Sequence, residues 1–205
     1  MTHTQETTAP APKIRNAQAT HDRLVRSALD LFTSQGYHGT TTPEIAARAG
    51  VAEGTIYRHF ASKQQLLNDI YGAAARRLSA AIQATPPTLS CSERLGQIAA
   101  AWRDVAMKEP AVVRLLFVSR LRALLDQPSR DAQSEVRDGL ERVIATGKAQ
   151  GQVRPGPADL WADVWLQLIT LMLERVANRE WTTEHTGPQQ VVQSAWRAIA
   201  MRAEE

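Results

Sequence analysis

The side chains best suited to chemistry gather in residues 53–63, where several hydrogen-bond donors follow one another closely. Arg58 can pair with the O6 and N7 acceptors of a guanine in the major groove, and Thr55 can contact a thymine methyl group or a phosphate. Tyr57 and His59 can donate hydrogen bonds to phosphate oxygens. These residue types within one short segment predict a surface that contacts DNA.

Charged residues stand at both ends of this segment. Lys63 begins the next expected helix, where free backbone N–H groups already favour a phosphate. Glu53 would repel a phosphate, and two interpretations of it are open. Its carboxylate accepts a hydrogen bond from cytosine N4, or it turns back toward the N-terminus of its own helix.

The donors need a rigid support, and the residues before them predict a short helix. Either Thr41 or Thr42 can cap this helix, and Pro43 suits its first turn. Glu44 lies three residues after Thr41, as a capping box requires. The helix is expected to end near residues 49–50.

A second short helix is expected over about residues 53–60, after a turn at residues 49–52. Gly50 permits the backbone conformation that a tight turn needs. Ile56 and Phe60 are four residues apart, so they share a helix face that can pack on a core and leave the polar side chains outside. Two short helices with this turn match the helix-turn-helix arrangement, in which the second helix enters the major groove.

The rest of the chain has the periodicity of helices and no alternating strand pattern of useful length. One helix is expected from Ala17 to just before Gly36, which suits a left-handed position after a helix. A long helix should begin at Ser62, which forms a capping-box pattern with Gln65, and should end before Pro86. Further helices are expected near residues 92–108, 110–126, 130–149, 157–179 and 188–202, with breaks at residues 109–110, 127–128, 151–157 and 186–188.

Composition narrows the class of protein. The chain has 205 residues, of which 43% are hydrophobic and 22% charged, as is ordinary for a globular protein. The formal net charge of +3 is a weak indication of an anionic partner. The start of the chain lacks the apolar run of a secretory signal, no stretch is long enough for a membrane helix, and Cys91 has no disulfide partner. A cytoplasmic protein without membrane association is expected.

The sequence contains few of the residue patterns that are typical of enzymes. It contains no glycine-rich phosphate loop, no Gly-x-Ser-x-Gly or His-Glu-x-x-His motif and no paired Cys-x-x-Cys. His59 has no second His or Cys near it at metal-ligand spacing. We therefore expect neither an enzyme nor a metal or other cofactor.

The segment of residues 40–63, TTTPEIAARAGVAEGTIYRHFASK, resembles the signature of the tetracycline-repressor (TetR) family of transcriptional regulators. The resemblance covers about residues 20–70. By this resemblance the DNA-facing positions are Thr42, Ala52, Glu53, Gly54, Thr55, Tyr57, Arg58, His59 and Lys63. Ala52 departs from a family that often has Ser here. Because Ala52 can neither cap the second helix nor donate to a phosphate, close packing is its expected role.

The resemblance also implies the domain organisation of an all-α protein. Residues 1–16 are expected to be a mobile tail, and residues 17–64 a three-helix DNA-binding domain with its helix-turn-helix at about residues 41–60. A fourth helix should join this domain to a larger helical domain, residues 65–205, that binds an effector and dimerises.

Apolar side chains predict where dimerisation and effector binding occur. Residues 160–176 are apolar on nearly every side, so more than one surface must cover them. By the resemblance, the last two expected helices form a four-helix interface in a homodimer through Leu168, Leu171, Met172, Val192, Ala195, Trp196 and Ile199. Tryptophans are more often core residues than ligand contacts, but the side chains expected around an effector are Trp102, Phe117, Leu121 and Trp165.

The expected function is that of a repressor on double-stranded, palindromic operator DNA, released by a small hydrophobic or aromatic effector. The effector would tilt the helix at residues 62–84, which begins at the DNA and runs into the second domain. An alternative is a non-specific or architectural DNA-binding protein without an effector. Such proteins depend on extensive basic surface, whereas this chain is nearly balanced in charge.

Overall fold

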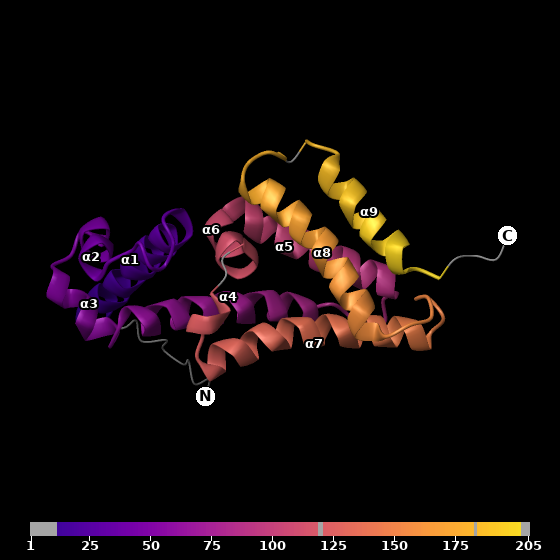
Figure 1. Ribbon diagram of the computed structural model, residues 1–205, viewed down its shortest axis with the longest axis horizontal. Helices are drawn as coiled ribbons and strands as arrows, with labels where there is room; N and C mark the ends of the chain where they lie inside the picture. The colour runs from indigo at the N-terminus through magenta and orange to yellow at the C-terminus, as the bar shows by residue number, and fades with distance from the viewer. Residues whose placement is uncertain (1–11, 119–120, 183, 202–205) are drawn as a thin grey trace, which may run out of the picture. The chain divides into compact units, whose positions relative to one another are not determined.

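The computed structural model describes residues 12–118, 121–182 and 184–201, and within these ranges the chain forms helices and no β-strand. The expected all-α fold class is confirmed. The chain divides into two compact units, Met1–Leu66 and Leu67–Glu205, whose helices are labelled in Figure 1.

Helix α1 (Pro12–Ser34) begins earlier than the expected start at Ala17. Proline suits the first turn of a helix, because its missing N–H would have no partner there. The expected mobile tail is therefore wrong for residues 12–16, and its remainder lies outside the described residues.

The first unit consists of α1, α2 (Thr42–Ala49), α3 (Glu53–His59) and the first turn of α4 (Lys63–Gln83). Its buried apolar side chains come from all four helices and their flanks: Leu24, Ala28, Phe32, Ile45, Ala46, Ala49, Ile56, Phe60 and Leu66. Burying one large apolar side chain contributes about 1.5–3 kcal/mol, so this core can hold the short helices that could not persist alone.

The ends of α2 have the conformations that the sequence predicts. The Thr41 hydroxyl accepts from the Glu44 N–H at 3.4 Å, and the Glu44 carboxylate accepts from the Thr41 N–H at 2.8 Å, which completes a capping box. At the other end Gly50 has a φ of 66°, a left-handed conformation that strains most other residues. The turn at Gly50 sets the direction in which the chain enters α3.

Helix α4 begins as expected after Ser62, but Gln65 does not complete the predicted capping box. The Gln65 N–H donates to the Ser62 hydroxyl at 3.0 Å, whereas the Gln65 side chain accepts from the Ala61 N–H at 2.6 Å. The helix then continues unbroken to Gln83, so one helix carries residues of both units.

In the second unit, α4 and α7 (Gln127–Ala149) lie side by side and run in the same direction (Figure 1). Near the start of both helices, the Ser129 hydroxyl donates to the Asn68 carbonyl at 3.1 Å. Further along, a Cβ added to Gly139 would lie 3.2 Å from the Ile82 side chain. The glycine therefore permits the close approach of the two helices.

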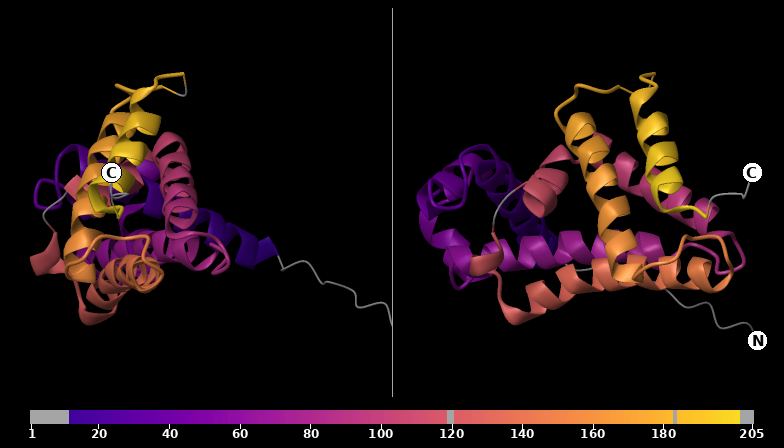
Figure 2. Two further views of the ribbon diagram at one scale, coloured as in Figure 1. Left: turned by 90° about the vertical axis from the view of Figure 1, so that its right-hand side faces the viewer. Right: turned by 45° about the vertical axis from the view of Figure 1, so that its right-hand side comes forward.

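Helix α8 (Ala158–Ala177) contacts α5 (Cys91–Lys108), α7 and α9 (Gly187–Ile199). Helices α8 and α9 form an antiparallel hairpin that Figures 1 and 2 show from three directions. An isolated antiparallel β-bridge between Val153 and Ala200 ties the end of α9 to the connection between α7 and α8. The expected helices near 92–108, 157–179 and 188–202 are confirmed, with ends shifted by at most three residues.

The single helix expected at residues 110–126 is wrong. Three short segments lie there instead: α6 (Pro110–Val113), a π-helical segment (Arg114–Val118) and a 3₁₀ turn (Arg122–Leu124). The Asn68 side chain donates to the Leu124 carbonyl at 3.3 Å and accepts from the Asp126 N–H at 2.8 Å. These backbone groups bond to α4 and so do not continue a helix of their own.

The expected break at residues 127–128 is also wrong, because α7 begins at Gln127 and not at residue 130. Asp126 is its N-cap and accepts from the Ser129 N–H at 2.9 Å. Pro128 lies in the first turn, where a missing N–H costs nothing. None of the described helices is both long and apolar enough to cross a bilayer.

Candidate nucleic-acid interface

Helix α3 has one buried face and one exposed face. Ile56 and Phe60 are only 1% and 2% exposed, which anchors the helix in the core of the first unit, as predicted. The exposed residues at or next to the start of the helix and on its outer face are Ala52, Glu53, Gly54, Tyr57 and Arg58, and the half-buried ones are Thr55 and His59. The polar side chains of α3 thus lie on the face that a DNA groove could receive.

Two predicted DNA-facing residues contact each other across the helix-turn-helix. The Thr42 Oγ1 and Tyr57 Oη atoms are 2.9 Å apart, and either can donate the hydrogen bond. Since Thr42 is the first residue of α2, this bond fixes the orientation of α3 relative to α2. Tyr57 remains 54% exposed, so most of its ring is still available to a partner.

Arg58 is an exposed cation with no hydrogen-bond or ion-pair partner among the described residues. Arg48 on α2 differs, because its guanidinium lies 3.3 Å from the Asp30 carboxylate. An unpaired guanidinium keeps all of its N–H donors for a base edge or a phosphate. Arg58 therefore has the chemistry for reading a guanine, as expected from its residue type.

Lys63 has partners within the chain, besides the phosphate contact that is predicted for it. Its ammonium donates to the carbonyls of Tyr37 at 2.9 Å and Thr40 at 2.7 Å, and it lies 4.2 Å from the centroid of the Tyr37 ring. Both carbonyls belong to the connection after α1, outside the regular hydrogen bonds of a helix, and the Tyr37 carbonyl also accepts from the Thr40 N–H at 3.3 Å. A phosphate contact through the third N–H stays a prediction.

Three smaller features complete this face. Ala52 is the N-cap of α3 and gives the helix no side-chain hydrogen bond, as its residue type dictates. A Cβ added to Gly54 would meet nothing within 4 Å, so the first turn of α3 has open space in front of it. The His59 ring lies 6.1 Å from the His21 ring and 6.3 Å from the Phe60 ring, measured between centroids.

The second unit has a cavity of about 240 Å³ that is lined by residues of α4, α7, α8 and the segment after α6. Of the four side chains predicted to surround an effector, Phe117 lines this cavity, whereas Trp102, Leu121 and Trp165 are buried and do not. The Trp102 Nε1–H donates to the Leu78 carbonyl at 3.1 Å. Its ring centroid lies 6.2 Å from that of Phe117 and 6.1 Å from that of Trp165. Trp102 therefore contacts two residues of the cavity lining, Phe117 and Leu78, and Trp165 packs on Trp102.

Polar groups of the same cavity escaped the sequence-based prediction. Tyr71, Gln133, Arg122 and Arg137 line it, and Arg137 is paired with the Asp163 carboxylate at 2.6 Å. Burial raises the pKa of Tyr71 to about 12, although nearby Arg122 and a hydrogen bond with Gln133 act in the opposite direction. Its hydroxyl stays protonated at neutral pH. A phenol within the apolar stripe of α4 was the pattern that could have revealed this site.

The predicted dimer residues separate into buried and accessible ones. Met172, Ala195 and Ile199 are at most 1% exposed, because α8 packs in the core of the second unit and α9 packs on it, so their surface is already used within one chain. This corrects their assignment to an interface. Leu171 is 42% exposed, and the half-buried members of the predicted set are Leu168, Val192 and Trp196.

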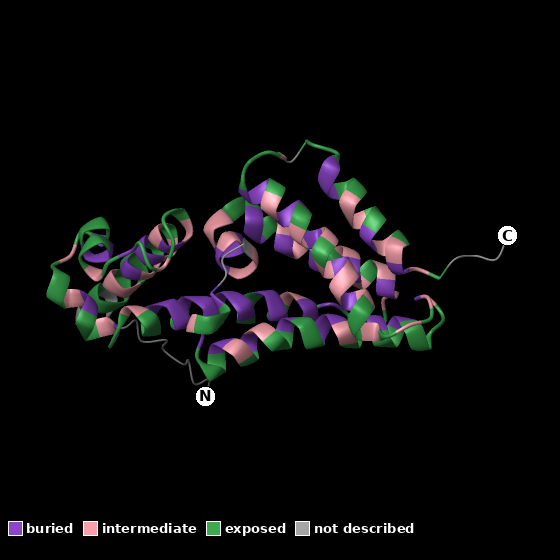
Figure 3. Cartoon of the chain, in the orientation of Figure 1, coloured by how far each residue is buried: buried purple, intermediate pink, exposed green. Residues whose placement is uncertain are grey.

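An apolar side chain that the prediction missed extends the accessible set. Leu160 is 47% exposed, and with Val164, Leu168 and Leu171 it recurs at the three- and four-residue spacing of one helix face. Figure 3 shows such exposed and half-buried positions alternating with buried ones along α8. We call these four residues the α8 outer face. Their spacing in the sequence could have identified them.

The geometry of α2 and α3 defines a class of protein. A capped helix, a left-handed glycine turn and a second helix with a buried and an exposed face form a helix-turn-helix, which presents side chains to DNA. Residues 24–70 match the family model described as bacterial regulatory proteins, tetR family.

Comparison with known proteins extends this match to most of the chain. The HTH-type transcriptional regulator TcmR of Streptomyces glaucescens is 31% identical over 185 residues, which cover 84% of this chain and 77% of that protein. The HTH-type transcriptional repressor KstR2 of Mycolicibacterium smegmatis is 27% identical over 65% of this chain and 67% of its own. A solved tetR family transcription regulator from Shewanella sp. PV-4 is 28% identical, with a TM-score of 0.73 over 89% of this chain and 99% of that one. The chain belongs to the TetR family, whose members are transcriptional regulators and not enzymes.

Proposed function

We propose that this regulator is a repressor that binds a palindromic operator and is released by a small, hydrophobic or aromatic effector. The observation that carries the proposal is the unpaired Arg58 guanidinium on an exposed helix face whose reverse side, Ile56 and Phe60, is locked in the core. A rigidly held donor fork can discriminate bases, whereas a mobile charge cannot. The name of the related KstR2, which matches 65% of this chain, supports repression, whereas the related FasR, which matches 46% of it, is named an activator.

The functions divide along the chain in this proposal. Residues 17–64 bind DNA, and residues 65–205 bind the effector and dimerise. The residues assigned to DNA contacts are Thr42, Ala52, Glu53, Gly54, Thr55, Tyr57, Arg58, His59 and Lys63. Each protomer reads one half-site, and two-fold symmetry of the dimer makes the operator palindromic.

The α8 outer face is the proposed centre of the dimer interface. Leucine side chains exposed to water at helical spacing form an unfavourable apolar surface. Covering this surface with a second copy of the chain lowers the free energy. An isologous interface places this helix against the same helix of its partner. Leu168 and Leu171 keep the role predicted for them, and Leu160 and Val164 join them.

The effector cavity is the proposed sensor. Phe117 offers an aromatic wall, while the Tyr71 hydroxyl and the Arg122 guanidinium offer donors. This lining suits a largely apolar ligand with one hydrogen-bond acceptor, and it disfavours a cation. Helix α4 carries Lys63 at its start and Tyr71 in the cavity, so a ligand that shifts α4 can change the DNA contacts.

Selection of binding sites from random DNA tests the proposal against an architectural protein. We expect one palindrome to be enriched, and Arg58→Ala to weaken binding to it by about 1–3 kcal/mol and to relax the preference at one position. Arg48→Ala, which removes a paired arginine of α2, is the matched control. Equal affinity for all sequences, with a steep dependence on salt, would instead support the architectural alternative.

Sedimentation equilibrium tests the dimer. Leu171→Glu should yield monomers at micromolar concentration, because it places a charge within the proposed interface. Met107→Glu, at an equally exposed residue of α5, should leave the dimer intact. A monomeric wild type, or a dimer that tolerates Leu171→Glu, would remove this part of the proposal.

Reciprocity tests the coupling. A hundredfold loss of operator affinity requires a ligand preference of about 2.7 kcal/mol for the released state. Operator DNA must then weaken ligand binding by the same factor. Tyr71→Phe should lower the affinity for the ligand without changing the operator affinity of the ligand-free protein. A ligand that binds this cavity tightly and leaves operator affinity unchanged would contradict the mechanism.

A further inference from the structure

A second cavity, of about 380 Å³, lies elsewhere in the second unit. Its lining residues come from α5, the last turns of α8, the connection from α8 to α9, and the first half of α9. It shares no lining residue with the effector cavity. Its volume falls within the range of small-molecule sites.

The floor of this cavity is apolar. Ala99, Met172 and Val176 line it and are at most 4% exposed. Gly96 widens it, because a Cβ at this position of α5 would meet nothing within 4 Å. The site thus has an apolar floor, and the open space at Gly96 leaves room for a flat ring system.

One wall is aromatic. Trp181 stacks on His185, with centroids 5.3 Å apart and ring planes at 14°. The His185 Nδ1 atom accepts from the Gly187 N–H at 2.9 Å, so the neutral ring carries its proton on Nε2. The pair gives the cavity an aromatic surface and one N–H donor, the Nε2–H of His185.

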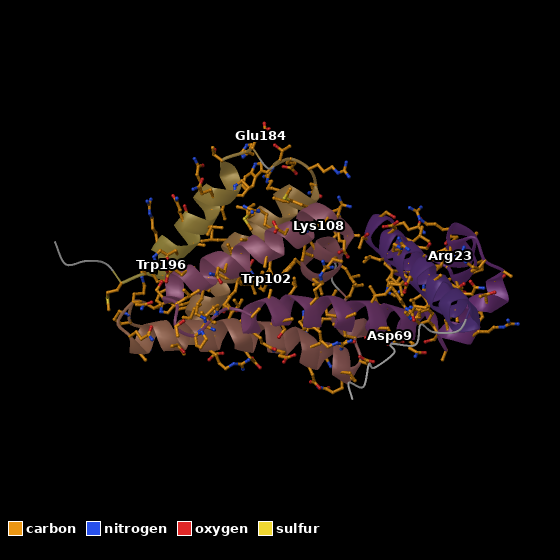
Figure 4. The ribbon with its side chains drawn as sticks, turned by 180° about the vertical axis from the view of Figure 1, so that it is seen from behind. Arg23, Asp69, Trp102, Lys108, Glu184 and Trp196 are labelled. Atoms are coloured by element: carbon orange, nitrogen blue, oxygen red, sulfur yellow. The ribbon has the colours of Figure 1, made fainter. Side chains whose placement is uncertain are left out.

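Arg103 supplies the charge. The Arg103 side chain is 42% exposed, but its Nε atom is buried and has no hydrogen-bond partner among the described residues. Its Nη2 atom lies 3.6 Å from the Asp104 carboxylate. A buried donor without an acceptor is unfavourable, and a ligand acceptor would satisfy it. The described lining contains no carboxylate, and Glu184 stands at the outer tip of the α8–α9 connection (Figure 4).

We propose that this cavity is a binding site for a small aromatic carboxylate. The carboxylate bonds to the Arg103 guanidinium, and the ring lies on the apolar floor beside Trp181. An anion fits because the ionisable groups of the described lining are an arginine and a histidine. A flat ring fits because an aromatic wall and an apolar floor meet there.

Isothermal titration calorimetry of the 205-residue chain with naphthoate tests the site, with naphthyl methanol as the uncharged probe. Arg103→Gln should raise the Kd of naphthoate at least about tenfold, equal to about 1.4 kcal/mol, and change that of naphthyl methanol less than about twofold. Gly96→Leu, which fits the open space on α5 and fills the cavity, should abolish binding of both probes. Arg142→Gln is the control for loss of an arginine elsewhere, and circular dichroism checks the fold of each variant.

Three results would overturn the proposal. The first is no saturable naphthoate binding to wild type up to about 1 mM. The second is binding that survives unchanged in both Arg103→Gln and Gly96→Leu. The third is binding that Arg122→Gln abolishes and Gly96→Leu does not, because the probe would then occupy the effector cavity.

Discussion

The Lys63 ammonium lies 4.2 Å from the centroid of the Tyr37 ring and donates to the carbonyl of the same residue. The two residues are 26 positions apart in the chain, and their contact joins the start of α4 to the connection between α1 and α2. Lys63 therefore belongs to the frame that holds the helix-turn-helix, in addition to any contact with DNA.

Loss of this contact should be measurable without DNA. We expect Lys63→Met to lower the free energy of urea unfolding by about 1–2 kcal/mol, because two carbonyls lose a charged donor. The exposed Lys108 of α5, changed in the same way, is the control and should have little effect. Unchanged stability, with only a smaller salt dependence of operator binding, would show that Lys63 acts on phosphate alone.

Gly54 should separate stability from DNA binding. Gly54→Ala should raise the unfolding free energy by about 0.5–1 kcal/mol, because alanine favours a helix and the added methyl group meets no atom. The same methyl group should weaken operator binding, since it would stand between α3 and the DNA. Gly96→Ala, at an equally open glycine of α5, should change operator affinity little. Full operator affinity in Gly54→Ala would show that α3 does not approach DNA at this turn.

The hydrogen bond between Thr42 and Tyr57 predicts coupling between α2 and α3. Thr42→Val and Tyr57→Phe each remove one hydroxyl of the 2.9 Å pair. A double-mutant cycle on operator affinity should give a coupling energy of about 0.5–1.5 kcal/mol. Strictly additive losses would mean that the two hydroxyls contact DNA independently.

The helix-turn-helix could be predicted because local sequence determines it. The Thr41 and Glu44 capping box and the left-handed Gly50 involve residues a few positions apart, and the spacing of Ile56 and Phe60 identifies the buried face. Such features are present in the sequence itself and need no knowledge of distant contacts.

The parts that could not be predicted depend on contacts between distant residues. Asn68 accepts from the backbone N–H of Asp126, 58 positions away, and Asp126 is the N-cap of α7 and not the last residue of a helix over 110–126. Met172 and Ile199 look like interface residues in the sequence, because burial within a chain and burial between chains select the same apolar side chains. Only the packing of α8 and α9 in the second unit shows which leucines remain outside.

The capping box of α2 predicts how acid affects stability. Hydrogen bonds from the hydroxyl and the N–H of Thr41 lower the pKa of Glu44 from its ordinary value of 4.5. The folded chain therefore keeps this carboxylate charged at a pH where the unfolded chain has begun to bind a proton. Its contribution to stability is present above the unfolded pKa and is lost as the pH falls through the lowered folded pKa.

We expect Glu44→Gln to lower the urea midpoint at neutral pH and to match wild type in strong acid. Thr41→Ala, which removes the hydroxyl from the same box, should flatten the same pH dependence. Parallel pH curves for wild type and Glu44→Gln would show that the carboxylate has the same pKa in both states.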